Sequence, residues 1–463
     1  MAWTFHIEHF GCRAARADGE AIGDRLRSVG CRAGQPSEAE LLIVNTCSVT
    51  AEADRAARAF IRRAHRLNPG ARIVVTGCYA QRAPEEAAAL PGVAAVVGNS
   101  HKALAPEILL SLAGDRPTPP RLVQLQSASA SSVPVWADDR FAHSFLEDAQ
   151  LVPGTQTRPN LKIQEGCGNR CSFCVIPQTR GPSRSLPAAA ILRQVEGFVA
   201  GDGKELVLSG INLGRWGRDL TGTPQTLAAL VRKIFRQTAL PRLRLSSIEP
   251  MDWDEELIGL MAEFGGTRLA RHAHLPLQSG SDAVLRRMFR RYRPWHYREK
   301  VAALARAAGP ELTLGADVMT GFPGETDAEF EETMAMVQDL PFGYLHLFPF
   351  SARPGTRAWE LHTQRPAPTP VVEDRMAALR ALAAEKTRAH RQRHLGKVVE
   401  TITLHTPADV EQSGRTLALT ENFLPVELPC RLPANRLVRV LVTGLTAAVA
   451  LSGLEVRAET DSR

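Results

Sequence analysis

The chain has 463 residues, of which 44% are hydrophobic and 23% charged, an ordinary composition for soluble globular domains. Eight cysteines in a chain this long, with no apolar stretch of signal-peptide or membrane-span length, argue against a disulfide-built secreted protein and a membrane protein. We therefore expect a cytoplasmic protein of two to four domains, and its net charge of +7 modestly favours a polyanionic partner.

Residues 1–112 alternate short apolar strands, at 4–10, 40–46 and 72–77, with helical stretches near 18–29, 51–67 and 83–90. This alternation predicts an open parallel α/β sheet covered by helices on both faces. A stretch rich in Pro, Ser and Ala follows, and 113–159 is predicted to be a linker or an irregular crossing segment.

Three cysteines of this first domain, Cys12, Cys47 and Cys78, each follow one of the predicted strands. The carboxyl ends of parallel strands meet along one edge, so we expect the three thiols to converge there. Nearby helix N-termini should also lower the pKa of the thiols and favour the thiolate that metals bind. The alternative is that they are unrelated small core residues.

Residues 160–392 contain six strand-like runs, each followed by a helical stretch, at 161–166, 205–214, 242–250, 272–280, 312–322 and 344–351. Six such units predict a partial (β/α)6 barrel with its site at the carboxyl ends of the strands. From 393 to 457 short alternating runs separated by Asn, Gly, Pro and Ser predict a small antiparallel β-barrel.

A second cysteine set, Cys167, Cys171 and Cys174, lies directly after the first barrel strand with C-x3-C-x2-C spacing. Three thiolates can hold three irons of a 4Fe–4S cluster and leave the fourth iron open for a small molecule. The flanking Gly166 and Gly168 would let the chain wrap closely around a cluster. A zinc site completed by a distant ligand, or buried thiols, are the alternatives.

This spacing, with Phe173 before the last cysteine, resembles the radical S-adenosylmethionine (SAM) superfamily. The resemblance implies that SAM binds the open iron and is cleaved to a 5′-deoxyadenosyl radical. It also suggests weaker candidates for SAM contacts: Phe173, Gly210, Asn212, Gln278, Ser279 and Phe350. All of these except Phe173 lie at strand ends, where glycines and polar residues that form turns are an equal alternative.

Two cysteine trios in this order resemble the methylthiotransferases, and the resemblance covers nearly the whole chain through stretches such as "VNTCSVTAEADRAAR", "VVTGCYAQRAPEE", "HLPLQSGSDAVLRRM" and "GADVMTGFPGETDAEFEET". It implies a second 4Fe–4S cluster on the first trio and a TRAM-type C-terminal β-barrel that grips RNA. "RGPSRS" and "FPFSARPGT" look most like the enzymes that act on N6-threonylcarbamoyladenosine in tRNA. One departure is Ala15, where the family usually has an asparagine.

The resemblance thus implies methylthio transfer to carbon 2 of that nucleoside, next to the anticodon, with one SAM for the radical and one as methyl donor. The expected partners are the tRNA anticodon stem-loop, an electron donor such as flavodoxin or ferredoxin, and a sulfur donor of unknown identity. The same chemistry on isopentenyladenosine in tRNA or on a ribosomal-protein aspartate remains open. So does a non-catalytic iron–sulfur protein that senses and binds RNA.

Residues 286–300 hold seven basic and four aromatic residues, a composition that suits binding of phosphates and unpaired bases. The alternative is a solvated helix face with core aromatics. A second basic stretch, 388–397, leads into the predicted β-barrel and gives that barrel a role in gripping the tRNA stem.

Overall fold

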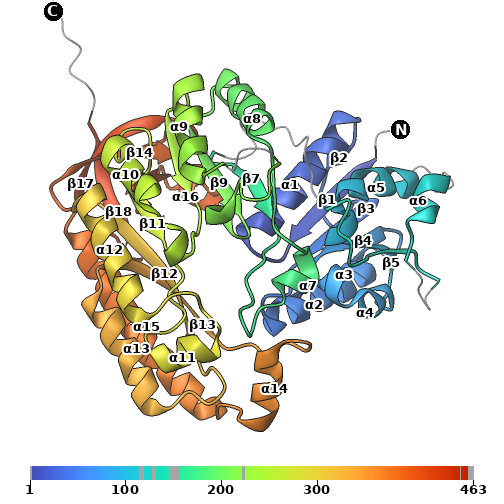
Figure 1. Ribbon diagram of the computed structural model, residues 1–463. Helices are drawn as coiled ribbons and strands as arrows, with labels where there is room; N and C mark the ends of the chain where they lie inside the picture. The colour runs from blue at the N-terminus through green and yellow to red at the C-terminus, as the bar shows by residue number, and fades with distance from the viewer. Residues whose placement is uncertain are drawn as a thin grey trace, which may run out of the picture.

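The computed structural model describes residues 3–113, 119–127, 132–144, 157–221, 225–448 and 450–456. Its elements form an N-terminal sheet covered by helices, a central partial barrel and a small C-terminal strand barrel (Figure 1). This is the predicted α/β architecture. Within the described residues, no helix is both long and apolar enough to cross a membrane.

The N-terminal sheet is parallel throughout, with strand order β2-β1-β3-β4-β5-β6. Its strands are β1 (Thr4–His9), β2 (Arg32–Ala33), β3 (Leu41–Thr46), β4 (Arg72–Gly77), β5 (Val93–Gly98) and β6 (Val135–Trp136). Its helices are α1 (Arg13–Ser28), α2 (Ala51–Leu67), α3 (Cys78–Arg82), α4 (Pro84–Ala88), the 3-10 helix η1 (Asn99–Leu104), α5 (Ala105–Ala113) and α6 (Pro120–Gln124). Strand β3 is buried at every position, as expected for a central strand with helices on both faces.

Strand β5 was not among the three strands predicted for this domain, and two predicted helices differ in detail. The first helix begins at Arg13 instead of residue 18, because Cys12 is its N-cap. The helix predicted at 83–90 is preceded by the separate helix α3, and Pro84 at the start of α4 marks the break between them. Of the predicted linker 113–159, the described part contains α6 and β6, and residues 114–118, 128–131 and 145–156 lie outside the described residues.

The central unit confirms the predicted six-stranded partial barrel. Its parallel strands are β7 (Asn160–Glu165), β9 (Glu205–Gly210), β10 (Arg242–Leu245), β11 (His272–His274), β12 (Thr313–Thr320) and β13 (Phe342–Pro349). They form two sheets, β10-β9-β7 and β11-β12-β13, joined by a bridge between Leu243 and Leu269, and β8 (Arg184–Ser185) adds an antiparallel edge to β7. Alternate strand residues such as Leu161, Ile163 and Leu314 join the core under the helices, so the intervening residues face the barrel interior.

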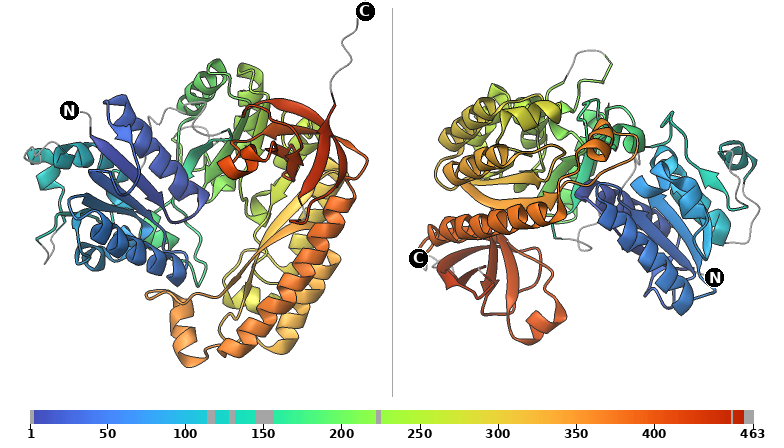
Figure 2. Two further views of the ribbon diagram at one scale, coloured as in Figure 1. Left: turned by 180° about the vertical axis from the view of Figure 1, so that it is seen from behind. Right: turned by 90° about the horizontal axis from the view of Figure 1, so that it is seen from below.

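The barrel's helices are α7 (Ile176–Arg180), α8 (Ala188–Ala200), η2 (Leu213–Arg215), α9 (Leu227–Gln237), η3 (Pro250–Asp252), α10 (Glu255–Phe264), α11 (Asp282–Arg287), α12 (Pro294–Ala308), α13 (Asp327–Asp339), α14 (Arg357–Gln364) and α15 (Thr369–Gln392). The long α15 packs along β13 and leads into the C-terminal barrel, as the right-hand view of Figure 2 shows.

The C-terminal unit is a closed barrel of β14 (Val398–Thr403), β15 (Thr416–Thr420), β16 (Pro425–Leu428), β18 (Leu451–Glu455) and β17 (Leu437–Leu445), with a short helix α16 (Ala408–Gln412). The prediction of a wholly antiparallel barrel is wrong at one pair, because β16 and β18 run parallel. That parallel pairing lets the last strand close the barrel. The predicted end of this domain, residue 457, lies outside the described residues.

Candidate active site

The loop after β7 carries the second cysteine trio, Cys167, Cys171 and Cys174. Gly166 begins it at φ +70, and a Cβ there would come within 2.0 Å of the Pro182 carbonyl oxygen, so only glycine fits. The amide of Cys167 donates to the Gly181 carbonyl at 3.1 Å, which ties the loop to the end of α7.

Each sulfur of this second trio accepts an N–H hydrogen bond, the contact that stabilises a thiolate or a cluster sulfur. The donors are Asn169 N at 3.4 Å and Asn212 Nδ2 at 3.5 Å to Cys167, Arg290 Nη1 at 3.4 Å to Cys171, and Ile176 N at 3.5 Å to Cys174.

The first trio lies along the carboxyl edge of the N-terminal sheet, after β1, β3 and β4. The structure brings the three residues together: Cys12 and Cys78 are close enough to Cys47 to affect its ionisation. A Cβ on Gly11 would lie 2.8 Å from Cys47 Cβ, so the backbone before Cys12 touches Cys47. Val49 N donates to Cys47 Sγ at 3.4 Å and Asn99 Nδ2 to Cys78 Sγ at 3.3 Å, whereas Cys12 is exposed.

The expectation of lowered thiol pKa values in the first trio is wrong for Cys47. Burial, reinforced by the neighbouring sulfurs, raises the pKa of Cys47 to about 12. Burial likewise raises the pKa of Cys171, and it raises that of Cys174 to about 12. The protein alone therefore favours neutral thiols at these three sites, and bound metal must supply the positive charge that removes the protons.

The donor sets of the candidate metal sites differ. Within the described part of the chain, His274, Asp317 and His346 are the only three metal-ligating side chains whose ligand atoms all lie within 4.8 Å of one another. Each cysteine trio instead offers three thiols, the donor set that holds three irons of a 4Fe–4S cluster and leaves the fourth iron open.

Ala15, at the position where an asparagine was expected, is buried on the first turn of α1. Its carbonyl accepts a hydrogen bond from Asn45 Nδ2 at 2.5 Å, and Asn45 stands two positions before Cys47. A side-chain amide is therefore present beside the first trio, although it comes from β3 and not from α1.

The candidate SAM residues differ in their surroundings and in whether other protein groups already bind them. Asn212 is buried beside Cys167, and Gly210 ends β9 with its Cα against Gln164. Phe173 packs against the barrel core. Gln278 has φ +61 and a buried, unpartnered Oε1.

The other two strand-end candidates have partners within the protein. The hydroxyl of Ser279 contacts that of Thr333 on α13 at 3.1 Å, which favours a packing role over contact with SAM. Phe350 packs edge-on against Phe322, with ring centroids 5.5 Å apart.

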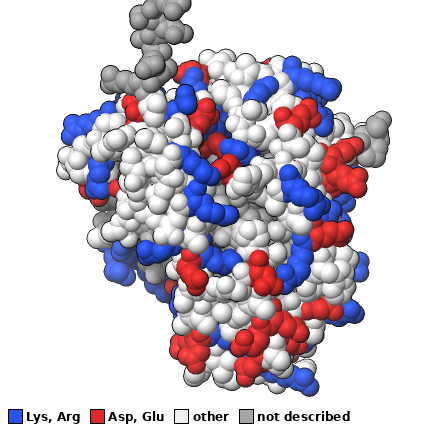
Figure 3. All heavy atoms as spheres, turned by 90° about the vertical axis from the view of Figure 1, so that its left-hand side faces the viewer, with Lys and Arg blue, Asp and Glu red and all other residues white. Residues whose placement is uncertain are grey.

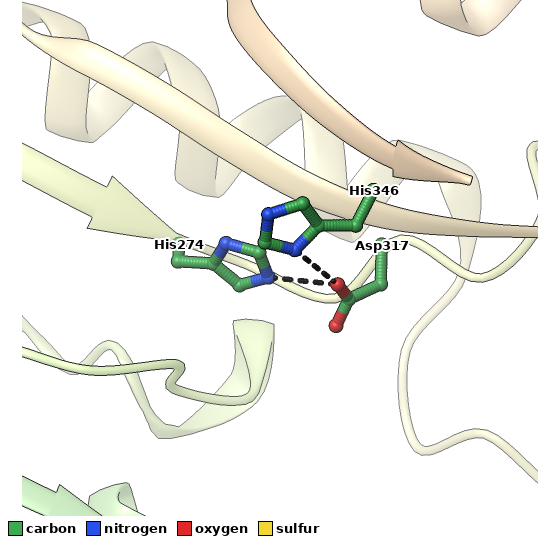
Figure 4. A group of neighbouring side chains, drawn as sticks. All are labelled: His274, Asp317 and His346. Carbon is green, nitrogen blue, oxygen red and sulfur yellow. Dashed lines mark hydrogen bonds and ion pairs between the residues drawn. The ribbon is translucent and has the colours of Figure 1, made fainter. Parts of the chain in front are cut away.

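The barrel interior holds a polar group that the sequence analysis missed. His274 Nε2 and His346 Nδ1 both lie near Asp317 Oδ1, at 3.1 and 3.2 Å (Figure 4). The Tyr344 hydroxyl contacts His274 Nδ1 at 3.0 Å and His272 Nε2 at 2.8 Å. Both imidazoles can donate to the one carboxylate oxygen, which satisfies the group without a metal ion and holds the pKa of Asp317 below its usual range despite burial.

The basic stretch 286–300 does not form a free phosphate-binding patch, because all seven basic side chains have partners within the protein. Arg286 and Arg293 pair with Asp282, Arg287 with Glu329, Arg290 with Glu249, Arg291 with Asp252, Arg298 with Asp339, and Lys300 donates to the Trp253 carbonyl. Tyr292 and Tyr297 are fully buried, whereas Phe289 and Trp295 are 45% and 55% exposed. The face turned away from the N-terminal sheet carries both acidic and basic side chains among uncharged ones (Figure 3).

Comparisons with known proteins agree with this architecture. The radical SAM superfamily model matches residues 161–337, and the model described as "Uncharacterized protein family UPF0004" matches residues 4–98. The chain is similar to the threonylcarbamoyladenosine tRNA methylthiotransferase MtaB of Bacillus subtilis, with 33% identity over 91% of this chain and 89% of that protein. It is also similar to the tRNA-2-methylthio-N(6)-dimethylallyladenosine synthase of Novosphingobium aromaticivorans, with 32% identity over 86% of each chain.

Among solved structures, the radical SAM methyltransferase TsrM from Kitasatospora setae shares the fold, with a TM-score of 0.52 and 16% identity over 77% of each chain. The length and level of the sequence similarities set aside a non-catalytic sensor. The radical SAM match implies one 4Fe–4S cluster and SAM as cofactors, and the match to residues 4–98 supports a second cluster. The chain belongs to the radical SAM methylthiotransferase family of enzymes.

Proposed function

We propose that this enzyme transfers a methylthio group to carbon 2 of N6-threonylcarbamoyladenosine, next to the anticodon of tRNA. One SAM serves as the radical source and another as the methyl donor. Relatives named for threonylcarbamoyladenosine and for dimethylallyladenosine are about equally similar to this chain, so overall identity does not choose between the two nucleosides. The choice rests on the lining of the barrel interior.

That lining is polar where an isopentenyl group would need hydrocarbon. His274, Asp317 and His346 present imidazole and carboxylate groups to the interior (Figure 4), and Tyr344 adds its hydroxyl beside His274. A threonylcarbamoyl group carries amide, hydroxyl and carboxylate groups that can exchange hydrogen bonds with such a wall. Hydrocarbon packed there would displace water from polar side chains without replacing their hydrogen bonds, which is unfavourable.

The cysteines are proposed to hold the cofactors. Cys167, Cys171 and Cys174 would bind the cluster that binds SAM, and Cys12, Cys47 and Cys78 would bind the second cluster. When bound, a 4Fe–4S cluster with an open iron holds SAM and supplies the electron for its cleavage. Around it, Phe173, Gly210, Asn212, Gln278 and Phe350 are the proposed SAM contacts.

The protein's own contribution is to fix these groups. The second trio is held by hydrogen bonds from Asn212 and Arg290, and the first trio by those from Asn99 and Val49. The C-terminal barrel is proposed to grip the tRNA stem, with the electron delivered by a flavodoxin or ferredoxin and the sulfur by a separate donor.

The test uses the full chain, reconstituted with iron and sulfide without oxygen and mixed with SAM and dithionite. Three anticodon stem-loop RNAs differ only next to the anticodon, where they carry threonylcarbamoyladenosine, isopentenyladenosine or adenosine. Nucleoside mass spectrometry should show the 2-methylthio product on the first RNA, with release of 5′-deoxyadenosine. A product confined to isopentenyladenosine would contradict the proposal.

A further inference from the structure

The side chain of Arg13 lies where the three units of the protein meet. Arg13 opens α1 directly after Cys12, and its guanidinium lies 5.5 Å from the ring centroid of Phe423. Phe423 stands in the turn between β15 and β16, and its ring is 5.5 Å from that of Tyr344 on β13. An arginine of the N-terminal domain thus reaches an aromatic side chain of the C-terminal barrel beside the interior of the central barrel.

Two further guanidiniums, those of Arg158 and Arg244, lie over the same ring, and both pair with Glu205. Arg244 is 5.2 Å from the Phe423 centroid and fully buried, and its Nε donates to Glu205 at 2.8 Å. Among the residues that the structure describes, none forms an ion pair or hydrogen bond with the Arg13 guanidinium. Three like charges therefore surround one aromatic side chain, and Arg13 is the one for which the described residues supply no counter-ion, so an anion beside Arg13 would relieve their repulsion.

The surroundings of Arg13 favour a small anion that enters the barrel interior. Arg13 is accessible to solvent, so a ligand can reach it. Phe423 contacts both Arg13 and Tyr344, and the Tyr344 hydroxyl contacts His274, so the guanidinium lies near the polar group of Figure 4. Because Arg13 is bonded to Cys12, its guanidinium is within one side chain's length of the first cysteine trio.

We propose that Arg13 binds the carboxylate of the substrate's threonyl group and thereby selects threonylcarbamoyladenosine over isopentenyladenosine. This inference rests on the proposed function and deepens it. The planar guanidinium offers paired N–H donors that match a carboxylate, and an isopentenyl group has no acceptor for them. Burying this guanidinium without an acceptor disfavours the apolar substrate, so Arg13 acts both for one nucleoside and against the other.

The test compares two substrates that differ by one charge. One anticodon stem-loop RNA carries threonylcarbamoyladenosine and the other carries its carboxamide, in which the threonyl carboxylate is replaced by a neutral amide. Methylthiolation rates and binding affinities are measured for the wild type, Arg13→Gln and Arg13→Lys. Arg16→Gln is the matched control, because Arg16 lies on the same helix, is exposed and pairs with Glu20. Iron content is measured for every variant.

The wild type should prefer the carboxylate RNA by about 10- to 100-fold in kcat/KM, the range of a hydrogen bond between charged groups. Arg13→Gln should lose that preference through a slower reaction and weaker binding of the carboxylate RNA, with the carboxamide RNA unaffected, and Arg13→Lys should keep part of it. Arg16→Gln should behave as the wild type.

An equal effect of Arg13→Gln on both RNAs, or none on either, would overturn the inference while the proposed function stands. An equal effect is also the result expected if Arg13 contacted an RNA phosphate or only supported Cys12, and the latter would lower the iron content as well. Failure of the wild type on threonylcarbamoyladenosine, with turnover of isopentenyladenosine, would instead refute the proposed function itself.

Discussion

Arg180 Nη1 and Asp18 Oδ2 form an ion pair at 3.2 Å, and neither side chain is exposed to solvent. Asp18 follows Cys12 by six positions, and Arg180 follows Cys174 by six positions. The pair therefore connects α1, which follows Cys12 of the first trio, to α7, which follows Cys174 of the second. Three further buried charges complete the network: Lys102, Lys162 and Glu165. Because every member of this buried network pairs with an opposite charge, it fixes the N-terminal sheet against β7 and so fixes the two trios relative to each other.

Replacing Asp18 with asparagine should destabilise the protein strongly. The change removes the carboxylate that Lys102, Lys162 and Arg180 share, and it leaves the buried Lys102 without its ion-pair partner. Breaking a buried ion pair in this way typically costs about 3–5 kcal/mol. Urea unfolding of the holoprotein should show a loss of about that size.

Asp24→Asn is the matched control on the same helix. Asp24 pairs with Arg27 one turn away, and the Arg27 side chain is 43% exposed. Its replacement should change the free energy of unfolding by no more than about 1 kcal/mol. Equal losses for the two variants would show that the network does not join the domains.

The sequence was sufficient to predict most of the elements that carry strong local patterns, although the apolar run of β5 was missed. Both cysteine trios follow strands that formed where expected, because a buried parallel strand is a continuous apolar run. The two-residue strands β2 and β6 carry no such pattern, and β18 was missed because its role depends on closing the barrel with β16. Pairing with partners distant in sequence defines such elements.

The polar group in the barrel interior and the interdomain network could not be predicted for the same reason. A histidine or aspartate within a strand has the same local pattern whether it faces solvent or the interior, and only closure of the barrel assigns His274, Asp317 and His346 to one place. Lys162 and Asp18 are 144 residues apart. The stretch 286–300 illustrates the opposite case, because its composition suggested free charges that folding instead pairs with acids far along the chain.

The two trios should bind iron independently. Wild-type protein purified without oxygen should contain about eight irons per chain, and Cys78→Ala or Cys174→Ala should each retain about four. Cys31→Ala and Cys430→Ala should keep all eight, because those residues lie in apolar clusters of the N-terminal and C-terminal domains. Iron and sulfide assays measure this directly. Zinc in either trio, or loss of all iron from one single variant, would contradict independent clusters.

Two asparagines should tune one cluster each. Asn99 donates to Cys78 Sγ and Asn212 to Cys167 Sγ. An N–H···S bond stabilises the more negative, reduced cluster, so removing it should lower the reduction potential. For a bond of about 1 kcal/mol the shift is about 40 mV for one electron.

Redox titrations followed by electron paramagnetic resonance can assign each shift. Asn99→Ala should lower the potential of the first-trio cluster only, and Asn212→Ala that of the second-trio cluster only. Each variant is thus the control for the other. Both potentials shifting in one variant would mean that these contacts are not local to their trios.

Phe289 should contribute to RNA binding through an exposed ring. It is 45% exposed with φ +56, a backbone conformation that is strained for a bulky residue. Arg357 lies 5.2 Å from its ring centroid, and Met288 next to it accepts a hydrogen bond from Ser172 of the second-trio loop. Stacking of one unpaired base is worth about 1–3 kcal/mol. Phe289→Ala should therefore weaken binding of the anticodon stem-loop about 10-fold.

Trp295→Ala is the matched control for that measurement. Trp295 is similarly exposed and belongs to the same stretch, but it lies on α12 against His296 and not beside the cysteine loop. Its replacement should change the affinity less than about 2-fold. A larger effect at Trp295 than at Phe289 would place the RNA on a different surface.

His390 should make the stability of the protein depend on pH. Burial, with help from Arg393, His394 and Arg391, lowers its pKa from 6.5 to about 3, and its Nε2 contacts the Thr313 hydroxyl at 2.9 Å. Because the folded state keeps this histidine neutral while the unfolded chain protonates near pH 6.5, its contribution is present above that pH and is lost as the pH falls towards 3.

Between pH 7.0 and 5.5, one such histidine removes about 1 kcal/mol from the free energy of unfolding. His390→Gln should lose stability at pH 7.0 but show a pH dependence that is smaller by this amount, measured by urea unfolding at the two pH values. His405→Gln, which changes an exposed histidine, should retain the wild-type pH dependence. If His390→Gln also retained the wild-type pH dependence, the acid sensitivity would come from another buried group. The packing of α15 on β13 around His390 would then not be the contact that opposes protonation.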